Sequence, residues 1–177
     1  MQLLRAGGCV LVMRHAQAPS TLPDASIAEP GNPGHERQLD AAGKASARAL
    51  GAALRTLSIP VGPIYSSPTY RALETIRLAR FGIPKVVEPL AEGGQRMMGA
   101  ADRANGRWLR RAAERLPPSG SNTLIVTHTP NIVGAFGRDV ADIHAAEIIV
   151  FEPKTGGRTQ LLGRITVEEW QQLARQR

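Results

Sequence analysis

Short apolar runs alternate along the chain with longer segments of helical periodicity. The predicted strands are residues 9–13, 63–65, 85–87 and 123–127, with 148–151 and 158–165 as a hairpin-like pair. The predicted helices are residues 41–57, 68–80, 101–115 and 130–136, and a last helix starts near Thr166. This alternation is typical of a three-layer α/β fold, in which helices flank a mostly parallel central sheet.

Two segments interrupt this pattern with residues that favour turns. Residues 19–38 contain four prolines and are predicted to form a long surface loop, and residues 88–94 form a turn-rich loop. Ser67 is the expected N-cap of the helix that follows it, because its hydroxyl can accept from the first helical N–H groups and Pro68 suits the first helical position.

Length and composition predict one folded domain over residues 1–177. Its excess of basic side chains favours anionic ligands. Hydrophobic residues make up 42% and charged residues 21%, close to the average for globular proteins. The 22 basic and 15 acidic side chains leave a formal net charge of +7. The arginines are scattered and aromatic residues reach only 4%, so we expect no nucleic-acid partner.

Cys9 is the only cysteine, which excludes an internal disulfide and a thiolate metal cluster within one chain. No run of about 18 apolar residues is present, so we expect no membrane partner. The visible N-terminus lacks the charged and apolar regions of a secretory signal. These features predict a cytoplasmic protein, with a periplasmic form whose signal has been removed as the alternative.

Polar side chains follow three predicted strands directly. Arg14 and His15 follow the first, Ser67 and then Arg71 follow the second, and His128 follows a later one. Ligands of open α/β sheets bind outside the carboxyl ends of the strands, so these residues can converge. Arginine matches phosphate oxygens with its planar donors, and a neutral imidazole can attack phosphorus. Each of these residues taken alone is more often structural, but their occurrence together after three strands predicts a phosphate site.

Four motifs resemble those of the histidine phosphatase superfamily, which includes cofactor-dependent phosphoglycerate mutases and histidine acid phosphatases. Residues 12–17 (VMRHAQ) resemble its Arg-His-Gly motif, and residues 65–75 (YSSPTYRALET) resemble its Ser-Ser-Pro, Arg-Ala, Glu-Thr signature. Residues 125–132 (IVTHTPNI) are similar to its second histidine motif, and residues 37–43 (RQLDAAG) to the Leu-Thr-x-x-Gly opening of its first helix. The resemblance implies a phosphoglycerate-mutase-like fold.

The resemblance also implies a metal-independent phosphatase without an organic cofactor, acting on a small-molecule or protein phosphomonoester. In that reading His15 is the nucleophile that becomes phosphohistidine, and its neighbours bind the phosphoryl oxygens and stabilise charge in the transition state. The expected substrate-binding residues are Arg14, Arg71, His128, Gln17 and Thr129.

The leaving alkoxide needs a proton, which a carboxylic acid can supply. Glu92 is the candidate, because residues 90–92 (LAE) look like the Leu-x-Glu stretch in which many members of the superfamily carry the acid. The alternative for Glu92 is a solvated loop carboxylate, and Glu88 is the second candidate for the acid.

The chain departs from the superfamily pattern at several points. Ala16 stands in place of the usual Gly, and Ala18 in place of a common Thr. The long substrate-covering insertion of classical mutases is not evident, which favours a small phosphatase. A phosphotransferase or mutase with the same first step, and a catalytically weak phosphate-binding interaction module, remain alternatives. No metal-ligand spacing is recognisable, and the sequence does not indicate an oligomeric state.

Overall fold

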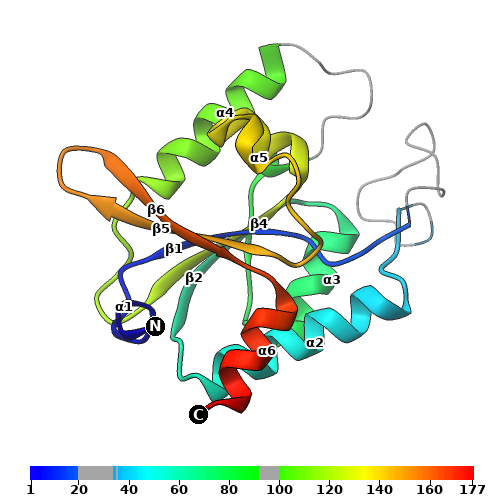
Figure 1. Cartoon of the computed structure of the whole chain (residues 1–177). Helices are drawn as coiled ribbons and strands as arrows, with labels where there is room; N and C mark the ends of the chain where they lie inside the picture. Colours follow the sequence, from blue (N-terminus) through cyan, green and yellow to red (C-terminus); the bar gives the residue numbers. More distant parts are fainter. Residues whose placement is uncertain (20–33, 35, 92–99) are drawn as a thin grey trace.

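The computed structural model describes residues 1–19, 34, 36–91 and 100–177. Its strands are β1 (Val10–Arg14), β2 (Val61–Ser66), β3 (Lys85–Val86), β4 (Asn122–Thr127), β5 (Ile148–Lys154) and β6 (Arg158–Ile165). Its α-helices are α1 (Gln2–Ala6), α2 (Ala41–Thr56), α3 (Tyr70–Ala79), α4 (Ala100–Ala113), α5 (Thr129–Phe136) and α6 (Val167–Arg175). The 3-10 helices are η2 (Glu88–Leu90) and η3 (Arg138–Val140). Figure 1 shows the sheet in the middle, with helices on both sides.

The strands form a mixed sheet in the order β3-β2-β4-β1-β5-β6. The strands from β3 to β1 are parallel, with Ile125 of β4 pairing with Val12 of β1 on one side and with Tyr65 of β2 on the other. β5 runs antiparallel to β1 and forms a hairpin with β6. The carboxyl ends of β1, β2 and β4 therefore lie at one edge, together with the start of β5. The predicted α/β class is confirmed.

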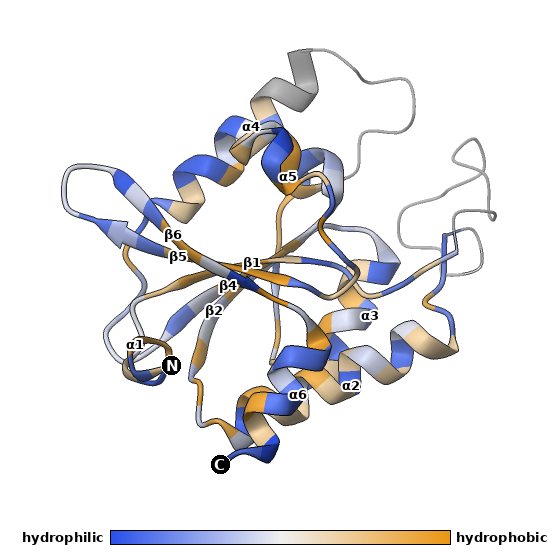
Figure 2. Cartoon of the chain, in the orientation of Figure 1, coloured by the Kyte–Doolittle hydropathy of each residue, from blue (hydrophilic) through white to orange (hydrophobic). Residues whose placement is uncertain are grey.

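Both faces of the sheet are covered by helices. Successive side chains of a strand point to opposite faces, so each central strand contributes to a core on either side. Leu11 and Met13 of β1 belong to the core that includes residues of α2, α3 and α6, whereas Val10 and Val12 belong to the core that includes residues of α4 and α5. All four are fully buried, and each such side chain contributes roughly 2 kcal/mol. Figure 2 shows hydrophobic residues along the central strands and more hydrophilic residues on the helices.

Two glycines let α2 approach neighbouring backbone more closely than any side chain would permit. A Cβ at Gly43 would lie 2.0 Å from the carbonyl oxygen of Gln17, and a Cβ at Gly51 would lie 1.9 Å from that of Ala79. Both distances are far inside van der Waals contact, so glycine is required at each position. Helix α2 therefore packs directly on the segment that follows β1 and on the end of α3.

Local details differ from the sequence predictions at three places. Helix α3 begins at Tyr70 with Thr69 as its N-cap, so the prediction of Ser67 as N-cap is wrong. Ser67 is still tied to the sheet through its N–H, which donates to Val126, and its hydroxyl contacts His128 instead. Residues 88–90 form η2 within a predicted loop, and α1 was not predicted. Within the described ranges, no helix is long and apolar enough to cross a membrane.

Candidate active site

His15 is the first residue after β1 and is held by hydrogen bonds from its backbone and its ring. Its N–H donates to the carbonyl oxygen of Thr127 at 3.0 Å, and the residue is 5% exposed. Nδ1 lies 2.7 Å from the carbonyl oxygen of Ala16. A carbonyl can only accept, so Nδ1 carries the proton, and Nε2 of the neutral ring carries the lone pair.

Arg71 connects His15 to the second histidine. It lies in the first turn of α3 and is 5% exposed. Its Nε donates to Nε2 of His15 at 3.2 Å, and its Nη2 lies 3.3 Å from Nδ1 of His128. One guanidinium thus contacts both imidazoles, whose centroids are 5.0 Å apart in an edge-to-face arrangement.

His128 follows β4 and is completely buried. Its Nε2 lies 2.8 Å from the hydroxyl oxygen of Ser67 and 3.3 Å from that of Thr69. Because Arg71 can only donate, Nδ1 of His128 accepts, and Nε2 therefore donates to the hydroxyl oxygens. In the sequence, Ser67 was predicted to cap a helix and to stand among the polar residues that follow the strands, whereas Thr69 was not singled out, although both stand in the motif 65–75.

Burial and the surrounding arginines keep both histidines neutral. Desolvation, followed by the positive charge of Arg71, lowers the pKa of His15 to about 3. Desolvation, the neighbouring His15 and then Arg71 lower the pKa of His128 as well. Neutral imidazole is the form that can act as a nucleophile or accept a proton.

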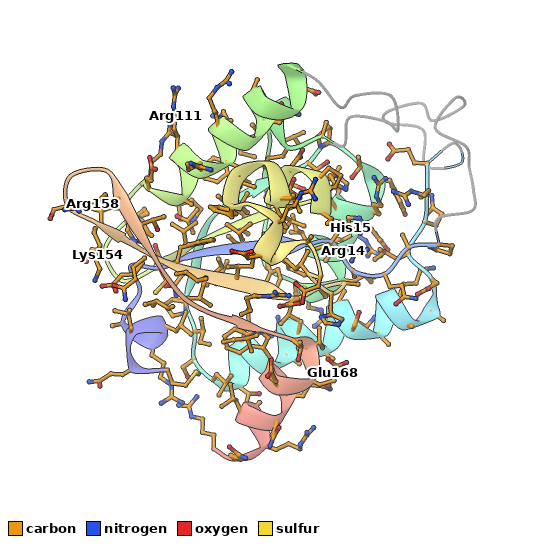
Figure 3. All side chains as sticks on the ribbon, turned by 45° about the horizontal axis from the view of Figure 1, so that its top comes forward. Arg14, His15, Arg111, Lys154, Arg158 and Glu168 are labelled. Carbon is orange, nitrogen blue, oxygen red and sulfur yellow. The ribbon has the colours of Figure 1, made fainter. Side chains whose placement is uncertain are left out.

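Arg14 ends β1, and its side chain is held by the loop that precedes β5. Its Nη1 donates to the carbonyl oxygen of Ile143 at 2.7 Å. In the same loop, the N–H of Ala146 lies 3.1 Å from the carbonyl oxygen of Arg14 and 3.2 Å from that of His15. Residues 143–146 therefore fix both Arg14 and the backbone of His15. Figure 3 labels Arg14 and His15 together at this end of β1.

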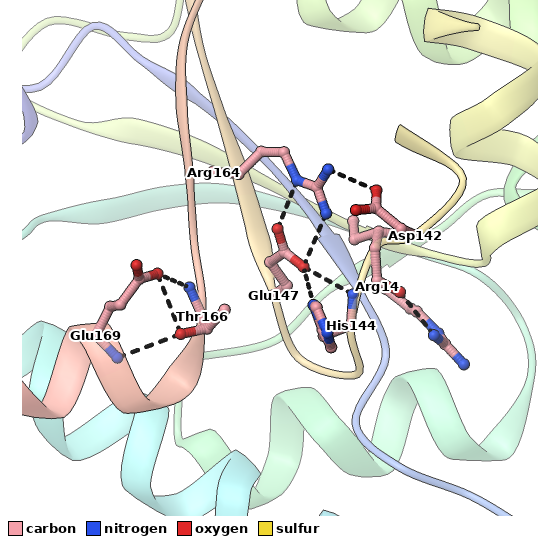
Figure 4. Close-up of polar contacts among 8 residues, drawn as sticks. Arg14, Asp142, His144, Glu147, Arg164, Thr166 and Glu169 are labelled. Atoms are coloured by element: carbon pink, nitrogen blue, oxygen red, sulfur yellow. Dashed lines mark hydrogen bonds and ion pairs between the residues drawn. The ribbon is translucent and has the colours of Figure 1, made fainter. Parts of the chain in front are cut away.

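Glu147 holds this loop in place from inside the protein. Its buried carboxylate accepts from Nε of Arg164 at 2.6 Å and from the backbone N–H of His144 at 2.7 Å. Burial raises the pKa of Glu147, but the hydrogen bonds from Arg164 and His144 outweigh it and leave the pKa below its ordinary value. The guanidinium of Arg164 also bonds to Asp142 at 2.7 Å, as the dashed lines in Figure 4 show. Sequence reasoning did not single out Glu147, because its partner lies on another strand.

Two further residues position the start of α3. The carboxylate of Glu36 is buried and accepts from the N–H of Tyr70, the first residue of that helix. Thr75 accepts from the N–H of Ala16 at 3.0 Å and donates to the carbonyl oxygen of Arg71 at 2.7 Å. A buried carboxylate at a helix N-terminus is also favoured by the helix dipole. In the sequence, Glu36 is distinguished only as an acidic residue shortly before the helix predicted over residues 41–57.

Arg37 adds a further positive charge to this region. Its charge lowers the pKa of His15 and that of His128, as does the charge of Arg14. Arg37 is only partly buried, so its side chain is not enclosed by the protein core. In the sequence, Arg37 stands in the motif 37–43, and no role was predicted for it.

The structure brings together four of the predicted site residues, Arg14, His15, Arg71 and His128, at the carboxyl edge of the sheet. We call these four residues the His-Arg cluster. Gln17 is exposed and Thr129 is partly buried at the start of α5. Within the described ranges, no side-chain hydrogen bond joins either of these two residues to the cluster.

Of the two candidate acids, only Glu88 lies in the described part of the chain. It is exposed on η2, and Glu92 lies outside the described residues. The chain just before Glu92 is anchored beside His128, because Nδ2 of Asn131 donates to the carbonyl oxygens of Leu90 at 2.9 Å and Ala91 at 3.0 Å. Residue 91 is therefore held against helix α5, which begins directly after His128.

The described residues contain no group of three or more His, Cys, Asp or Glu side chains arranged to hold a metal ion. The titratable groups of the cluster are two neutral imidazoles, and its cations are guanidinium groups. Chemically, this set can bind an oxyanion through fixed positive charge and offers an uncharged nitrogen for attack.

Solved structures with the same fold include several phosphatases. The protein histidine phosphatase SixA, in complex with tungstate, matches with a TM-score of 0.63 and 17% identity over 90% of this chain and 97% of its own. A mutant phosphoserine phosphatase from Entamoeba histolytica, in complex with phosphoserine, matches with a TM-score of 0.62 and 15% identity over 91% and 98%. A mycobacterial glucosyl-3-phosphoglycerate phosphatase matches with a TM-score of 0.57 and 15% identity over 88% and 97%.

Sequence comparison gives one match to a protein family and none to an individual protein. No curated protein matches the chain. Residues 10–92 match the model of the histidine phosphatase superfamily, branch 1, a range that includes Arg14, His15 and Arg71 of the His-Arg cluster. Residues 10–92 thus match the histidine phosphatase superfamily, and the fold of the described residues agrees with that match.

Proposed function

We propose that this protein is a phosphatase that hydrolyses phosphomonoesters through a phosphohistidine at His15. The observation that carries the proposal is the state of the His15 ring. Nδ1 donates to Ala16, and Nε2 is uncharged and directed at the guanidinium of Arg71. A phosphoryl group bound to Arg71 thus lies next to the lone pair of Nε2.

In the first step, Nε2 of His15 forms a bond to phosphorus, and the bond from phosphorus to the leaving oxygen breaks. The ring gains positive charge when this bond forms. Its Nδ1–H remains hydrogen-bonded to the carbonyl oxygen of Ala16, which stabilises the charged ring. The negative charge that spreads over the phosphoryl oxygens is stabilised by Arg14 and Arg71, with His128 as a neutral neighbour.

The leaving oxygen takes its proton from a carboxylic acid, for which we propose Glu92. The anchoring of Leu90 and Ala91 by Asn131 supports this choice, because it fixes the preceding residues beside His128. In the second step, water attacks phosphorus, the bond to Nε2 breaks, and the carboxylate of Glu92 takes the proton from water. Inorganic phosphate leaves, and His15 returns to the neutral form.

The solved structures support the reaction class more than any one substrate. They include a protein histidine phosphatase, a phosphoserine phosphatase and a glucosyl-3-phosphoglycerate phosphatase. The feature these activities share is removal of a phosphoryl group from a larger molecule. We propose a small-molecule or protein phosphomonoester as the substrate of this chain, and a reaction that needs no metal ion.

The test is phosphate release from a panel of phosphomonoesters with EDTA present, on wild type and on His15→Ala. We expect release by wild type only. Rapid mixing of wild type with a labelled substrate, followed by an alkaline quench that preserves phosphohistidine, should give a labelled protein that His15→Ala does not give. Equal release by both proteins would refute the assignment of His15, and loss of release with EDTA would refute the metal-free reaction.

A pair of substrates isolates the role of Glu92. An aryl phosphate with an acidic phenol leaves without protonation, whereas an alkyl phosphate needs the acid. We expect Glu92→Gln to lower kcat on the alkyl phosphate by about a hundredfold and to change phosphohistidine formation from the aryl phosphate much less. Glu88→Gln is the matched control on the other candidate. If Glu88→Gln instead lowered kcat selectively on the alkyl phosphate, Glu88 and not Glu92 would be the acid.

A further inference from the structure

Four arginines line a surface hollow on the side of α2 and α3 that faces away from the sheet. Arg48 and Arg55 come from α2, Arg77 comes from α3, and Arg80 follows α3 directly. The hollow has a volume of about 360 Å³, and Leu78 is the only apolar residue that lines it in the part of the chain that the structure describes. All four arginines are exposed. Such a volume is in the range of small-molecule sites.

The backbone arrangement brings these charges together. Arg48 and Arg55 are seven residues apart, which places them on one face of α2, two turns from each other. Gly51 lies between them, at the point where α2 touches the carbonyl oxygen of Ala79. Arg55 donates to that same carbonyl oxygen at 2.7 Å. The close helix contact therefore sets arginines of α2 directly opposite those at the end of α3.

The positive charge of the hollow is only partly neutralised. Glu74 bonds to Arg77 through both carboxylate oxygens, at 2.6 and 2.7 Å. Within the described ranges, no carboxylate forms an ion pair with Arg48, Arg55 or Arg80. Like charges held this close repel each other, and a bound anion removes that repulsion. The hollow thus has three cations that an anionic ligand can bind.

This hollow is separate from the His-Arg cluster. Arg71 lies in the first turn of α3 and Arg80 lies just beyond its end, nine residues later. At 1.5 Å per helical residue, the two arginines are roughly 14 Å apart along the helix, and Arg77, which also lines the hollow, is roughly 9 Å from Arg71. A single phosphate group cannot contact both sites.

We propose that the hollow between α2 and α3 is a second anion site, which binds a compact small molecule with several phosphate groups. Several phosphates are required because the cations converge from two helices, and planar guanidinium groups bind phosphate oxygens in pairs. A small ligand fits better than a nucleic acid strand, because the arginines surround a hollow and no aromatic side chain lines it for base stacking. This inference does not depend on the proposed phosphatase activity.

The test uses inorganic tripolyphosphate as the probe and calorimetry as the measurement. The protein is the full chain with His15→Ala and Arg71→Ala, which removes the proposed nucleophile and weakens anion binding at the His-Arg cluster. We expect this background protein to bind one tripolyphosphate, and to bind inorganic phosphate at least about tenfold more weakly because it makes fewer charged contacts.

Two pairs of substitutions, made in that background, test the location. Arg48→Ala with Arg80→Ala removes two cations of the hollow and spares the arginines that bond to Ala79 and Glu74. We expect it to weaken tripolyphosphate binding by about tenfold or more. Arg111→Ala with Arg158→Ala is the matched control, because both are exposed and lie on α4 and β6 (Figure 3). We expect it to change binding by less than about threefold.

Four results would overturn the proposal. The first is no binding of tripolyphosphate to the background protein, and the second is an equal loss of affinity in the two arginine pairs, which would indicate net charge alone. The third is equal affinity for inorganic phosphate and tripolyphosphate, which would remove the need for several phosphates. The fourth is tighter binding of a single-stranded oligonucleotide, reduced by both pairs, which would indicate an extended nucleic-acid surface.

Discussion

Arg71 donates a hydrogen bond from Nε to Nε2 of His15 at 3.2 Å, so the lone pair of the proposed nucleophilic atom is engaged by a guanidinium donor. Phosphorus must replace this donor before a bond to Nε2 can form. A phosphoryl oxygen can accept the released Arg71 N–H, because guanidinium has several donors in one plane. Arg71 therefore has two proposed tasks, which are to keep Nε2 neutral and to bind the group that Nε2 attacks.

Replacing Arg71 should lower activity by more than the loss of one positive charge, because its guanidinium also contacts both histidines. We expect Arg71→Ala to lower kcat/KM by about a hundredfold to a thousandfold. We expect Arg71→Lys to recover only a small part of this loss, because an ammonium group cannot contact both histidines in the plane of a guanidinium. Steady-state kinetics on an aryl phosphate measures both, with Arg111→Ala as an exposed control. Full activity of Arg71→Lys would contradict the geometric role.

The lowered pKa of His15 predicts that the protein loses stability in acid. In the unfolded chain a histidine binds a proton near pH 6.5, but folded His15 binds it only near pH 3. Between these values the unfolded state holds more protons, so the free energy of unfolding falls as the pH falls through this window. The slope from one such histidine is at most about 1.4 kcal/mol per pH unit.

Urea unfolding in phosphate-free buffer, repeated across this pH window, measures the effect. His15→Ala should show a shallower dependence than wild type, with His128 still contributing in the same direction. NMR of the histidine rings should show His15 neutral, with its proton on Nδ1, throughout the neutral range. Identical pH dependence in the two proteins would contradict the predicted shift.

Glu147 should matter for stability and activity together. We expect Glu147→Gln to lower the free energy of unfolding by about 1–3 kcal/mol, because Arg164 and the backbone N–H of His144 lose a buried, charged acceptor. Activity should fall as well, since the loop that holds Arg14 loses its anchor. Asp142→Asn is the matched control, because Asp142 bonds to the same Arg164 from an exposed position. We expect less than about 1 kcal/mol from it, and equal losses from both would argue against a special role for Glu147.

Arg37 is expected to contribute to substrate binding through its charge. We expect Arg37→Ala to raise KM by about threefold to tenfold, with a smaller change in kcat, because its charge adds to the potential at the histidines. The effect should shrink as ionic strength rises. Kinetics at low and high salt, with Arg111→Ala as the control, measures it. A loss confined to kcat would instead place Arg37 at the reacting group.

The main parts of the site were predictable because their chemistry is local in the sequence. Arg14, His15 and His128 each follow an apolar run directly, and parallel strands place such positions at one edge. Arg71 was predictable from the turn that leads from β2 into α3. The prediction of one domain over residues 1–177 stays a prediction, as do the roles assigned to the residues of the His-Arg cluster and to Glu92, Gln17 and Thr129.

The supporting residues could not be predicted in the same way, because their partners lie far away in the sequence. Glu147 depends on Arg164 in β6, and Glu36 depends on Tyr70 in α3. Periodicity shows which face of an element is apolar, but it does not show which carboxylate becomes buried against which donor. The arginines of the α2 and α3 hollow are a similar case, since only the contact at Gly51 brings them together.

The direction of β5 also has a practical consequence. Because β5 runs antiparallel to β1, the turn that joins it to β6 lies at the opposite edge of the sheet from His15. The turn contains the exposed residues Gly156 and Gly157, and Figure 1 shows it projecting from the body of the molecule. A fluorophore or an affinity tag attached there would report on the protein without covering the His-Arg cluster.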